Sequence, residues 1–343
     1  MVAAVDVLYR ALYHGVLARV PERAGLALGQ WGLRHLALDR LSLFRNEDAR
    51  LAITLGGVRL PNPLILSSMY YDVAILRRAM GLGWGAVTAK SITPGPRPGH
   101  PEPTVVRIRT AEGPGLVNCN GFRNPGLAAY RAALAGLTHR VPLIVAAAGE
   151  SAEDYVRVVE GLEAFGDLVE INISSPNTAL VYGWSTRPHE LGALFRAVRA
   201  ATRKPVIVKI SPDFRETNET ITIPAALDAG ITIVNYGNTR RIEEPRLSQG
   251  TGGLSGPALL ATTLDNVGRV RERFGDRLEL IATGGIDSPD AARRALAAGA
   301  TACGIFTGFV TRGPLLPRRI LDALVSDLGR EETSGNRRVE KWN

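Results

Sequence analysis

Cysteine, histidine and aromatic residues are scarce in this sequence of 343 residues. The two cysteines, Cys119 and Cys303, are too few for a disulfide framework, a four-cysteine zinc site or a cysteine-bound iron–sulfur cluster. The five histidines are scattered and lack the paired spacing of a histidine-built metal site. Aromatic residues make up only 6% of the chain, which argues against stacking platforms for single-stranded nucleic acid. We therefore expect neither a metal site nor nucleic-acid binding.

Long apolar runs are also missing. No run approaches the roughly 18 residues that a transmembrane helix needs. Asp6 and Arg10 interrupt the segment in which a signal peptide would have its apolar core. Both absences predict an intracellular protein. Apolar residues nevertheless make up 45% of the chain and charged residues 22%, which is the balance of a globular protein with a sizeable core.

Lysine is rare, although the formal net charge is +8. Of the 41 basic residues only Lys90, Lys204, Lys209 and Lys341 are lysines, so arginine supplies most of the positive charge. The arginines are spread along the chain, which is typical of a solvated surface. A lysine inside an apolar segment is therefore informative, because its compact charge and movable pKa suit a reactive centre.

The first 45 residues predict two amphipathic helices. Leu8, Leu12 and Val16 recur at helical spacing, and a second helix begins after Pro21. Basic residues lie beside the apolar ones in both helices. Two interpretations stay open: a helical hairpin that caps a larger domain, and a hairpin that lies in the membrane interface.

From residue 46 to residue 328, short β-rich runs alternate with helical segments. Each run is apolar until its last residues, as expected of parallel strands that are buried on both faces. Eight such repeats predict an α/β fold of the TIM (β/α)8 barrel type, with a doubly wound parallel sheet as the alternative. The segment 93–125 predicts an elaboration at the barrel mouth, and residues 329–343 predict a polar tail that is disordered. The eight runs are 63–68, 85–91, 142–149, 168–175, 205–212, 231–239, 278–285 and 302–308.

Polar side chains gather where the predicted strands end, which is where a TIM barrel carries its chemistry. Lys90 and Lys209 both fall at strand ends, although each could also be a surface lysine whose stem covers apolar residues. Several asparagines near the same ends suit a planar ligand with amide or carboxylate edges, although each alone could be a loop cap. These asparagines are Asn118, Asn120, Asn172, Asn177 and Asn238.

Glycines follow the last two predicted strands. Residues 283–288 read Thr-Gly-Gly-Ile-Asp-Ser, and residues 306–308 read Phe-Thr-Gly. Backbone N–H groups in these two loops of a TIM barrel commonly bind phosphate. The pattern GxGxxG does not follow the first strand, which disfavours a Rossmann site for NAD. The sequence therefore predicts a phosphate-bearing ligand at the barrel mouth.

Five motifs stand in the order in which a known enzyme family carries them: Gly-Leu-Val-Asn-Cys-Asn-Gly-Phe-Arg-Asn (115–124), Asn-Ile-Ser-Ser-Pro-Asn (172–177), Val-Lys-Ile-Ser-Pro-Asp (208–213), Gly-Gly-Leu-Ser-Gly (252–256) and Gly-Gly-Ile (284–286). Over residues 50–328 the chain resembles dihydroorotate dehydrogenase, and its N-terminal hairpin resembles the membrane-associated, quinone-using class. The resemblance implies an FMN-dependent barrel that oxidises dihydroorotate to orotate in pyrimidine biosynthesis and passes the electrons to a quinone.

The same resemblance implies roles for individual residues. Ser175 would be the catalytic base, where cytosolic classes carry cysteine, and Lys90 would be a second catalytic residue. Serine is a weak base, so a proton relay through neighbours or water is implied. The implied substrate-binding residues are Asn118, Asn120, Gly121, Phe122, Asn172, Asn177, Asn238 and Thr239. The implied FMN-binding residues are Ser67, Ser68, Ser91, Asn172, Lys209, Gly256, Gly284, Gly285, Phe306 and Thr307.

Some residues depart from the family pattern. Asp72 stands where the quinone-using class has a lysine, whereas Lys90 resembles a lysine of the cytosolic classes. Because the charge of Asp72 would repel a substrate carboxylate, we expect this residue to point away from the pocket or to pair with an arginine. Further departures are Ala147 for an asparagine, Ala179-Leu180 for Pro-Gly, and Asn120 for an apolar residue.

Three functions follow in order of preference. The first is dihydroorotate oxidation with a quinone acceptor. The second is a related flavoenzyme that acts on another cyclic amide, lactam or enone, and the third is a catalytically inactive flavin-binding protein, because a fold does not fix a function. For the first function we expect residues 1–45 to contact the cytoplasmic face of the cell membrane peripherally, with the rest of the chain in the cytoplasm.

Overall fold

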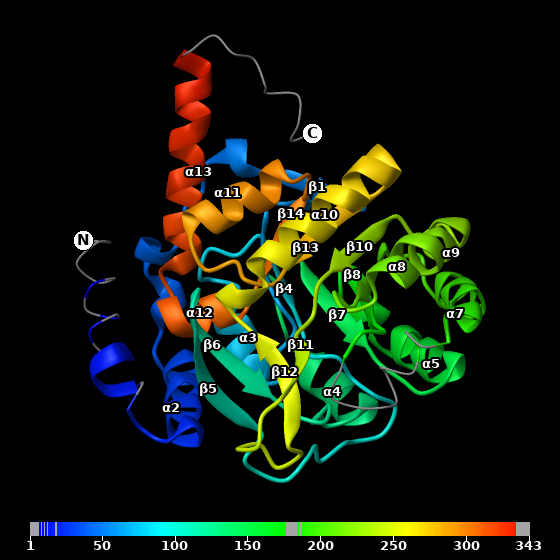
Figure 1. Cartoon of the computed structure of the whole chain (residues 1–343), viewed down its shortest axis with the longest axis horizontal. Coiled ribbons are helices and arrows are strands. Elements are labelled where there is room, and N and C mark those ends of the chain that lie inside the picture. The colour runs from blue at the N-terminus through cyan, green and yellow to red at the C-terminus, as the bar shows by residue number, and fades with distance from the viewer. Residues whose placement is uncertain are drawn as a thin grey trace.

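A closed barrel of eight parallel strands forms the centre of the molecule (Figure 1). A computed structural model describes residues 7, 9, 11, 13–17, 19–175, 184 and 187–333. The closure confirms the predicted TIM barrel and excludes the doubly wound sheet, and every barrel strand lies inside one of the eight predicted runs. In the order of their pairing around the barrel the strands are β10 (Ile233–Tyr236), β13 (Glu279–Thr283), β14 (Ala302–Ile305), β3 (Leu64–Leu66), β4 (Ala86–Thr88), β7 (Leu143–Ala147), β8 (Leu168–Asn172) and β9 (Val206–Ile210).

Helices surround the strands because each has one apolar face. In α5 (Ala152–Leu162) the buried residues Tyr155, Val158, Val159 and Leu162 follow the helical period, and Ser151 caps the first turn by accepting a hydrogen bond from the Asp154 amide. The other outer helices are α3 (Val73–Ala79), α4 (Leu127–Leu134), α7 (Pro188–Ala201), α8 (Arg215–Thr217), α9 (Ile223–Asp228), α10 (Leu260–Phe274), α11 (Pro289–Ala297), α12 (Thr307–Arg312) and α13 (Leu316–Thr333).

The barrel interior is built in layers, because alternate residues of a strand point to the same side. The lower layer takes one apolar side chain from each strand: Ile65, Ala86, Ile144, Leu168, Ile207, Ile233, Ile281 and Ala302. Beneath it a hairpin of β1 (Ile53–Leu55) and β2 (Val58–Leu60) closes the barrel with the fully buried Leu55 and Leu60. Two residues further along each strand lies what we call the upper layer, which is small or polar: Ser67, Thr88, Ala146, Glu170, Lys209, Asn235, Thr283 and Gly304.

A second, antiparallel sheet stands at the mouth of the barrel. Its order is β11 (Arg240–Glu243), β12 (Thr251–Ser255), β6 (Gly113–Asn118) and β5 (Val105–Thr110), and it joins the loops that follow β4 and β10 (Figure 1). The elaboration expected over 93–125 is therefore confirmed as β5 and β6. The pair β11–β12 was not predicted from the sequence.

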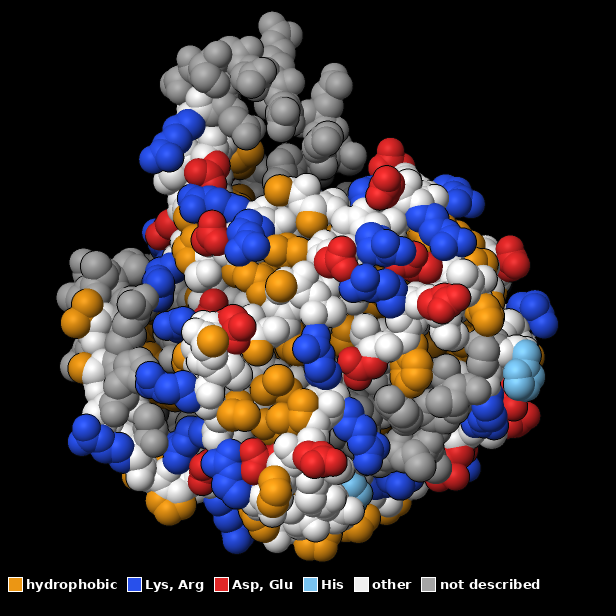
Figure 2. Space-filling model, viewed as in Figure 1, with side chains coloured by type: hydrophobic (Ala, Val, Ile, Leu, Met, Phe, Trp, Pro, Cys, Tyr) orange, Lys and Arg blue, Asp and Glu red, His pale blue; other side chains and the backbone are white. Residues whose placement is uncertain are grey.

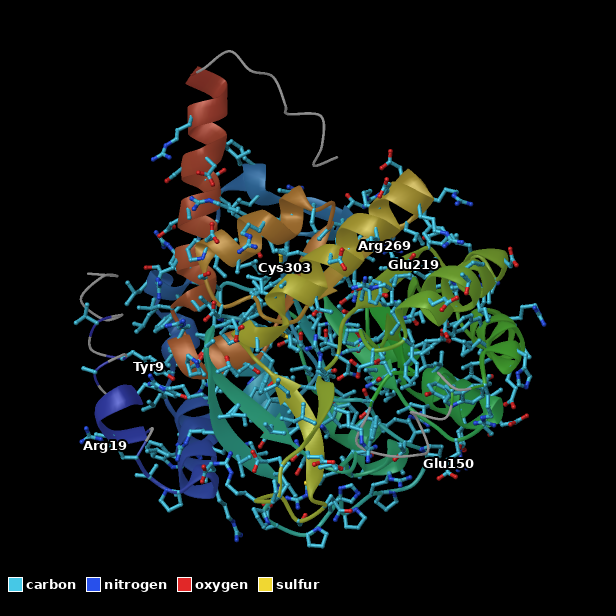
Figure 3. The ribbon with its side chains drawn as sticks, viewed as in Figure 1. Tyr9, Arg19, Glu150, Glu219, Arg269 and Cys303 are labelled. Atoms are coloured by element: carbon cyan, nitrogen blue, oxygen red, sulfur yellow. The ribbon has the colours of Figure 1, made fainter. Side chains whose placement is uncertain are left out.

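The N-terminal segment lies against this sheet. Helix α2 (Glu22–His35) contacts β5 and α3, which confirms the second predicted helix. Of the first predicted helix, Tyr13–Leu17 form a short π-helix, and several residues before it lie outside the described residues. Tyr9 lies beside α12 (Figure 3), where its hydroxyl donates a hydrogen bond to the Val310 carbonyl at 2.9 Å. Arg107 of β5 donates a hydrogen bond to the Val20 carbonyl. Its Nε also forms an ion pair with Glu22 Oε1 at 3.8 Å.

Two observations bear on the expected domain boundaries. Phe44 belongs to the barrel core, and the buried Asp39 forms a 2.7 Å ion pair with Arg78, so the segment 38–44 packs with the barrel. Helix α13 continues to Thr333, five residues past the expected end of the barrel at 328.

The surface carries charges of both signs. Figure 2 shows Lys and Arg side chains interspersed with Asp and Glu on the face in view, as expected of a diffuse basic surplus. Some of these charges form ion pairs between helices, such as Arg269 of α10 with Glu219 at 3.1 Å (Figure 3). Within the described part of the chain, no helix combines the length and the apolar character that a membrane span requires.

Candidate active site

A single cavity of about 1100 Å³ runs from the mouth of the barrel to α2. Its volume exceeds the usual range for one small ligand, so it has room for a cofactor and a second molecule. It is lined by Tyr9, by residues along α2, and by most of the residues singled out in the sequence. These are Ser67, Ser68, Lys90, Asn118, Asn120, Lys209, Asn238, Thr239, Gly256, Gly284, Gly285, Phe306 and Thr307.

The floor of the cavity belongs to the upper layer of the barrel. Ser67, Lys209, Thr283 and Gly304 line it, and the hydroxyls of Ser67 and Thr283 have no hydrogen-bond partner among the described residues. A Cβ at Gly304 would lie 2.0 Å from the Thr283 hydroxyl, so the floor is open at that strand only because glycine is there. Buried polar atoms normally have partners, and these hydroxyls therefore indicate a polar ligand above them.

Loops with positive φ form one end of the cavity. Gly285 has φ +80°, and a Cβ there would lie 2.4 Å from the backbone nitrogen of Leu260, so only glycine fits where this loop passes α10. The hydroxyls of Thr307 and Ser255 are hydrogen-bonded at 2.8 Å, which fixes the start of α12 against the second sheet. The close backbone approach is what a phosphate site built from N–H groups requires.

Two asparagines are held by one buried serine. Asn238 donates from Nδ2 to the Ser174 hydroxyl at 2.8 Å, and Ser174 donates to Asn172 Oδ1 at 3.1 Å. Asn172 in turn donates from Nδ2 to the Ser91 hydroxyl at 3.1 Å, and its carbonyl accepts from the Tyr155 hydroxyl at 2.8 Å. The network fixes the orientation of the Asn172 and Asn238 amides. Such fixed donors and acceptors suit a planar ligand.

The segment 118–122 supplies the opposite wall. Asn120 donates from Nδ2 to Asn118 Oδ1 at 3.3 Å, and both residues line the cavity. Gly121 and Phe122 do not line it. A Cβ at Gly121 would lie 2.8 Å from the His100 backbone nitrogen, and Phe122 packs against Ala148. These two residues therefore support the cavity wall through their packing and are not part of its lining.

Two lysines and an arginine converge on the cavity. Lys90 follows β4, Lys209 lies on β9, and both line the cavity, as does Arg123, which forms a 3.5 Å ion pair with Glu102. Burial lowers the pKa of Lys90 to about 8, with further lowering by the charges of Lys209 and Arg123. The site is thus positively charged and suits an anionic ligand.

Asp72 does not oppose these cations. Its Oδ2 forms a 2.7 Å ion pair with Arg34 of α2, and its Oδ1 accepts hydrogen bonds from the Ala74 and Ile75 amides at the start of α3. Of the two expected outcomes, pointing away from the pocket or pairing with an arginine, the structure shows the pairing. Its carboxylate serves as a helix cap and as a link between α2 and the barrel.

Some of the remaining predicted residues are buried without being part of the cavity lining, and others lie outside the described residues. Ser91, Asn172 and Ser175 are buried, with Ser175 8% exposed, and the network above joins Ser91 and Asn172 to Asn238 of the lining. Asn177, Ala179 and Leu180 lie outside the described residues. Ala147 is buried at the end of β7, where its methyl group offers a ligand no polar atom.

Sequence reasoning assigned no role to Arg123, Thr283 and Glu170. All three stand inside or beside motifs quoted above, so the signal was present. What was missing was the direction of the side chain. Barrel closure decides that Glu170 and Thr283 point inward, and the loop conformation around residue 122 decides that Arg123 reaches the cavity.

Comparisons with known proteins agree with this geometry. The family model described as dihydroorotate dehydrogenase matches residues 50–328. A dihydroorotate dehydrogenase (quinone) of Thermus thermophilus is 33% identical, with 92% of this chain and 95% of the relative covered. One of Chloroflexus aurantiacus is also 33% identical, with 82% and 83% covered. The crystal structure of DHODH from Eimeria tenella in complex with ferulenol shares the fold, with a TM-score of 0.81 at 24% identity over 96% of this chain and 97% of that chain.

Proposed function

Because the chain belongs to the dihydroorotate dehydrogenase family, we propose that it oxidises dihydroorotate to orotate in pyrimidine biosynthesis, with FMN as cofactor and a quinone as electron acceptor. The observation that carries this proposal is the single cavity that joins the cations and asparagines of the barrel mouth to the apolar side chains of α2. One end suits a charged planar substrate, and the other suits an apolar acceptor.

The residues present fit FMN. Gly256, Gly284, Gly285 and Thr307 would hold its phosphate through backbone and hydroxyl donors, and Lys209 and the unpartnered hydroxyls of the upper layer would contact its ring system. When bound, FMN supplies a hydride acceptor that can afterwards deliver electrons to a quinone.

The substrate would be oriented by the asparagine network and deprotonated by Ser175. Asn118, Asn172 and Asn238 present amide groups whose orientation is fixed by their own hydrogen bonds, so little reorganisation is needed when dihydroorotate binds. The Ser175 hydroxyl would accept the proton from C5 of dihydroorotate and pass it on through a neighbouring group or water, because serine alone is a weak base.

The positive charge of the site would stabilise the anionic species of the reaction. Dihydroorotate carries a carboxylate, and a bound FMN would accept negative charge with the hydride, so Lys90 and Lys209 would face anionic groups. Lys90 lines the cavity and would face the carboxylate, taking over the part of the lysine that Asp72 replaces.

A quinone would reach the site between the hairpin and the barrel. Leu28, Trp31 and Leu36 line the cavity and are also about half exposed, so the cavity opens among apolar side chains. Six of the eight large apolar side chains exposed in the described residues lie between Val7 and Leu41. Such a surface, with arginines beside it, suits peripheral contact with a membrane from which a quinone enters.

The first expected result concerns the cofactor. The purified protein should be yellow and contain about one FMN per chain, since the glycine loops after β13 and β14 form one phosphate site. Extraction and chromatography of the flavin measure this. Finding FAD, or no flavin after reconstitution, would contradict the proposal.

The second expected result concerns the hairpin. Deleting residues 1–36, which leaves the core residue Phe44 in place, should lower quinone-dependent turnover roughly tenfold or more, because the apolar wall of the quinone path is lost. Reduction of the flavin by dihydroorotate without quinone should change far less. The truncated protein should also no longer sediment with lipid vesicles. Equal quinone turnover in both forms would show that the hairpin is only a cap.

A further inference from the structure

Glu170 is a buried carboxylate that the mechanism above does not use. It lies in the upper layer of the barrel and is 1% exposed. Its Oε2 accepts a hydrogen bond from Asn235 Nδ2 at 2.8 Å, and its Oε1 lies 3.9 Å from Lys209 Nζ. Lys209 lines the cavity, whereas Glu170 does not. A carboxylate this deep is costly unless a positive charge accompanies it, which makes Lys209 its natural partner.

The surroundings of Lys209 contain one negative charge. From β8 it faces Glu170, and from β10 its register partner is the neutral Asn235. On the side of β3 its Nζ lies 3.5 Å from the Ser68 hydroxyl, and on the side of β4 it meets the positive charge of Lys90. Among the described residues, only Glu170 therefore offsets the charge of Lys209 inside the barrel.

Lys90 is the other lysine of this cavity, and no carboxylate of the described residues forms an ion pair with it. Lys90 is partly exposed, whereas Lys209 is only 6% exposed. The deeper lysine has less contact with water, so a nearby carboxylate matters more for its charge.

We propose that Glu170 is a positioning residue that keeps Lys209 in its ammonium form and holds it at the floor of the cavity. It acts on the cofactor only through Lys209. The identity of that cofactor rests on the function proposed above, whereas the charge state of Lys209 does not. The expected consequence is that Lys209 offers a full positive charge to the bound cofactor, which would stabilise its reduced form.

The scarcity of lysine makes a direct test practical. Lysine labelled with ¹³C at the ε position gives one signal for each of the four lysines, and the signal of Lys209 is assigned by its loss in Lys209→Arg. The ε-carbon shift reports whether the amine carries its proton. Glu170→Gln removes the charge and keeps an acceptor for Asn235. In this variant the pH at which half of Lys209 is neutral should fall by at least about one unit. At a given pH below that midpoint this corresponds to about tenfold more neutral amine.

Two further variants separate charge from structure. Glu279→Gln removes a carboxylate at the opposite end of the barrel, where Glu279 accepts from the Gly56 amide, and should leave the Lys209 signal unchanged. Glu170→Gln combined with Asn235→Asp moves the carboxylate from β8 to β10 and should restore the parent titration of Lys209. A Lys209 signal that titrates alike in the parent and in a folded Glu170→Gln protein would overturn the proposal, as would failure of the relocated carboxylate to restore it.

The reduction potential of the bound cofactor gives a second, independent measurement. The reduction potential of bound FMN in Glu170→Gln should fall toward that of Lys209→Met at alkaline pH, where Lys209 of the variant is neutral. If the reduction potential of the variant differed from that of the parent by the same amount at every pH, control of the Lys209 charge by Glu170 would be contradicted. Failure to bind FMN would instead refute the proposed function, and the lysine signals would still decide the role of Glu170.

Discussion

Replacing Ser175 with alanine is expected to slow the reduction of the flavin by dihydroorotate by about 10²- to 10⁴-fold, the usual contribution of a positioned base. FMN content should stay the same, because Ser175 does not belong to the proposed phosphate site. Stopped-flow absorbance under anaerobic conditions measures the rate directly. Quinone should still reoxidise the reduced variant at the parent rate, since that step does not involve C5 of the substrate.

Ser175→Cys is the matched control. A thiol of ordinary pKa, about 8.5, ionises far more readily than a serine hydroxyl, so this variant should keep more activity than Ser175→Ala and gain activity as pH rises toward that value. Equal rates in the parent, alanine and cysteine proteins would show that the proton leaves by another group, and Ser175 would not be the base.

Lys90→Ala is expected to lower kcat/KM for dihydroorotate by roughly 10²-fold or more, about 3 kcal/mol of transition-state stabilisation. The reason is the loss of the cation nearest to the substrate carboxylate. Asp72→Asn is the contrasting variant. It removes the charge at the position where the quinone-using class has a lysine, keeps a side chain that can cap α3, and should change kcat/KM little.

The pH profile gives an independent check on Lys90. Since its pKa is lowered to about 8, Lys90 is charged below that pH and neutral above it. The value of kcat/KM should therefore fall about tenfold per pH unit above pH 8. In Lys90→Arg the guanidinium stays charged, so any remaining activity should not show this fall. An essential Asp72 beside a dispensable Lys90 would mean that the substrate presents a cation or donor there, and dihydroorotate would be the wrong substrate.

The barrel could be predicted because its strands are buried on both faces. Runs such as 143–147, where every residue is buried, are apolar throughout and contrast with the amphipathic helices between them. The pair β11–β12 gave no such signal. Arg240–Glu243 is charged and partly exposed, and Thr251–Ser255 contains two glycines. They become strands by pairing with each other and, through β12, with β6 across the mouth.

The site could be predicted in part. Residues at strand ends, such as Lys90 and Asn238, were found because every parallel strand of the barrel ends at the same face. The sequence suggested an arginine as a partner of Asp72 but did not indicate which arginine. Arg34 is 38 residues away, and the ion pair exists because α2 packs against α3. Glu170 reads as one polar residue in an apolar strand until barrel closure places it beside Lys209.

The central claim is that this chain oxidises dihydroorotate with its own flavin. Adding dihydroorotate to the purified, FMN-containing protein under anaerobic conditions tests it most directly. The account predicts that the visible absorption band of the flavin is bleached, that orotate appears in an amount equal to the flavin, and that a quinone then restores the band. A flavin that dithionite reduces but dihydroorotate leaves oxidised would contradict the account.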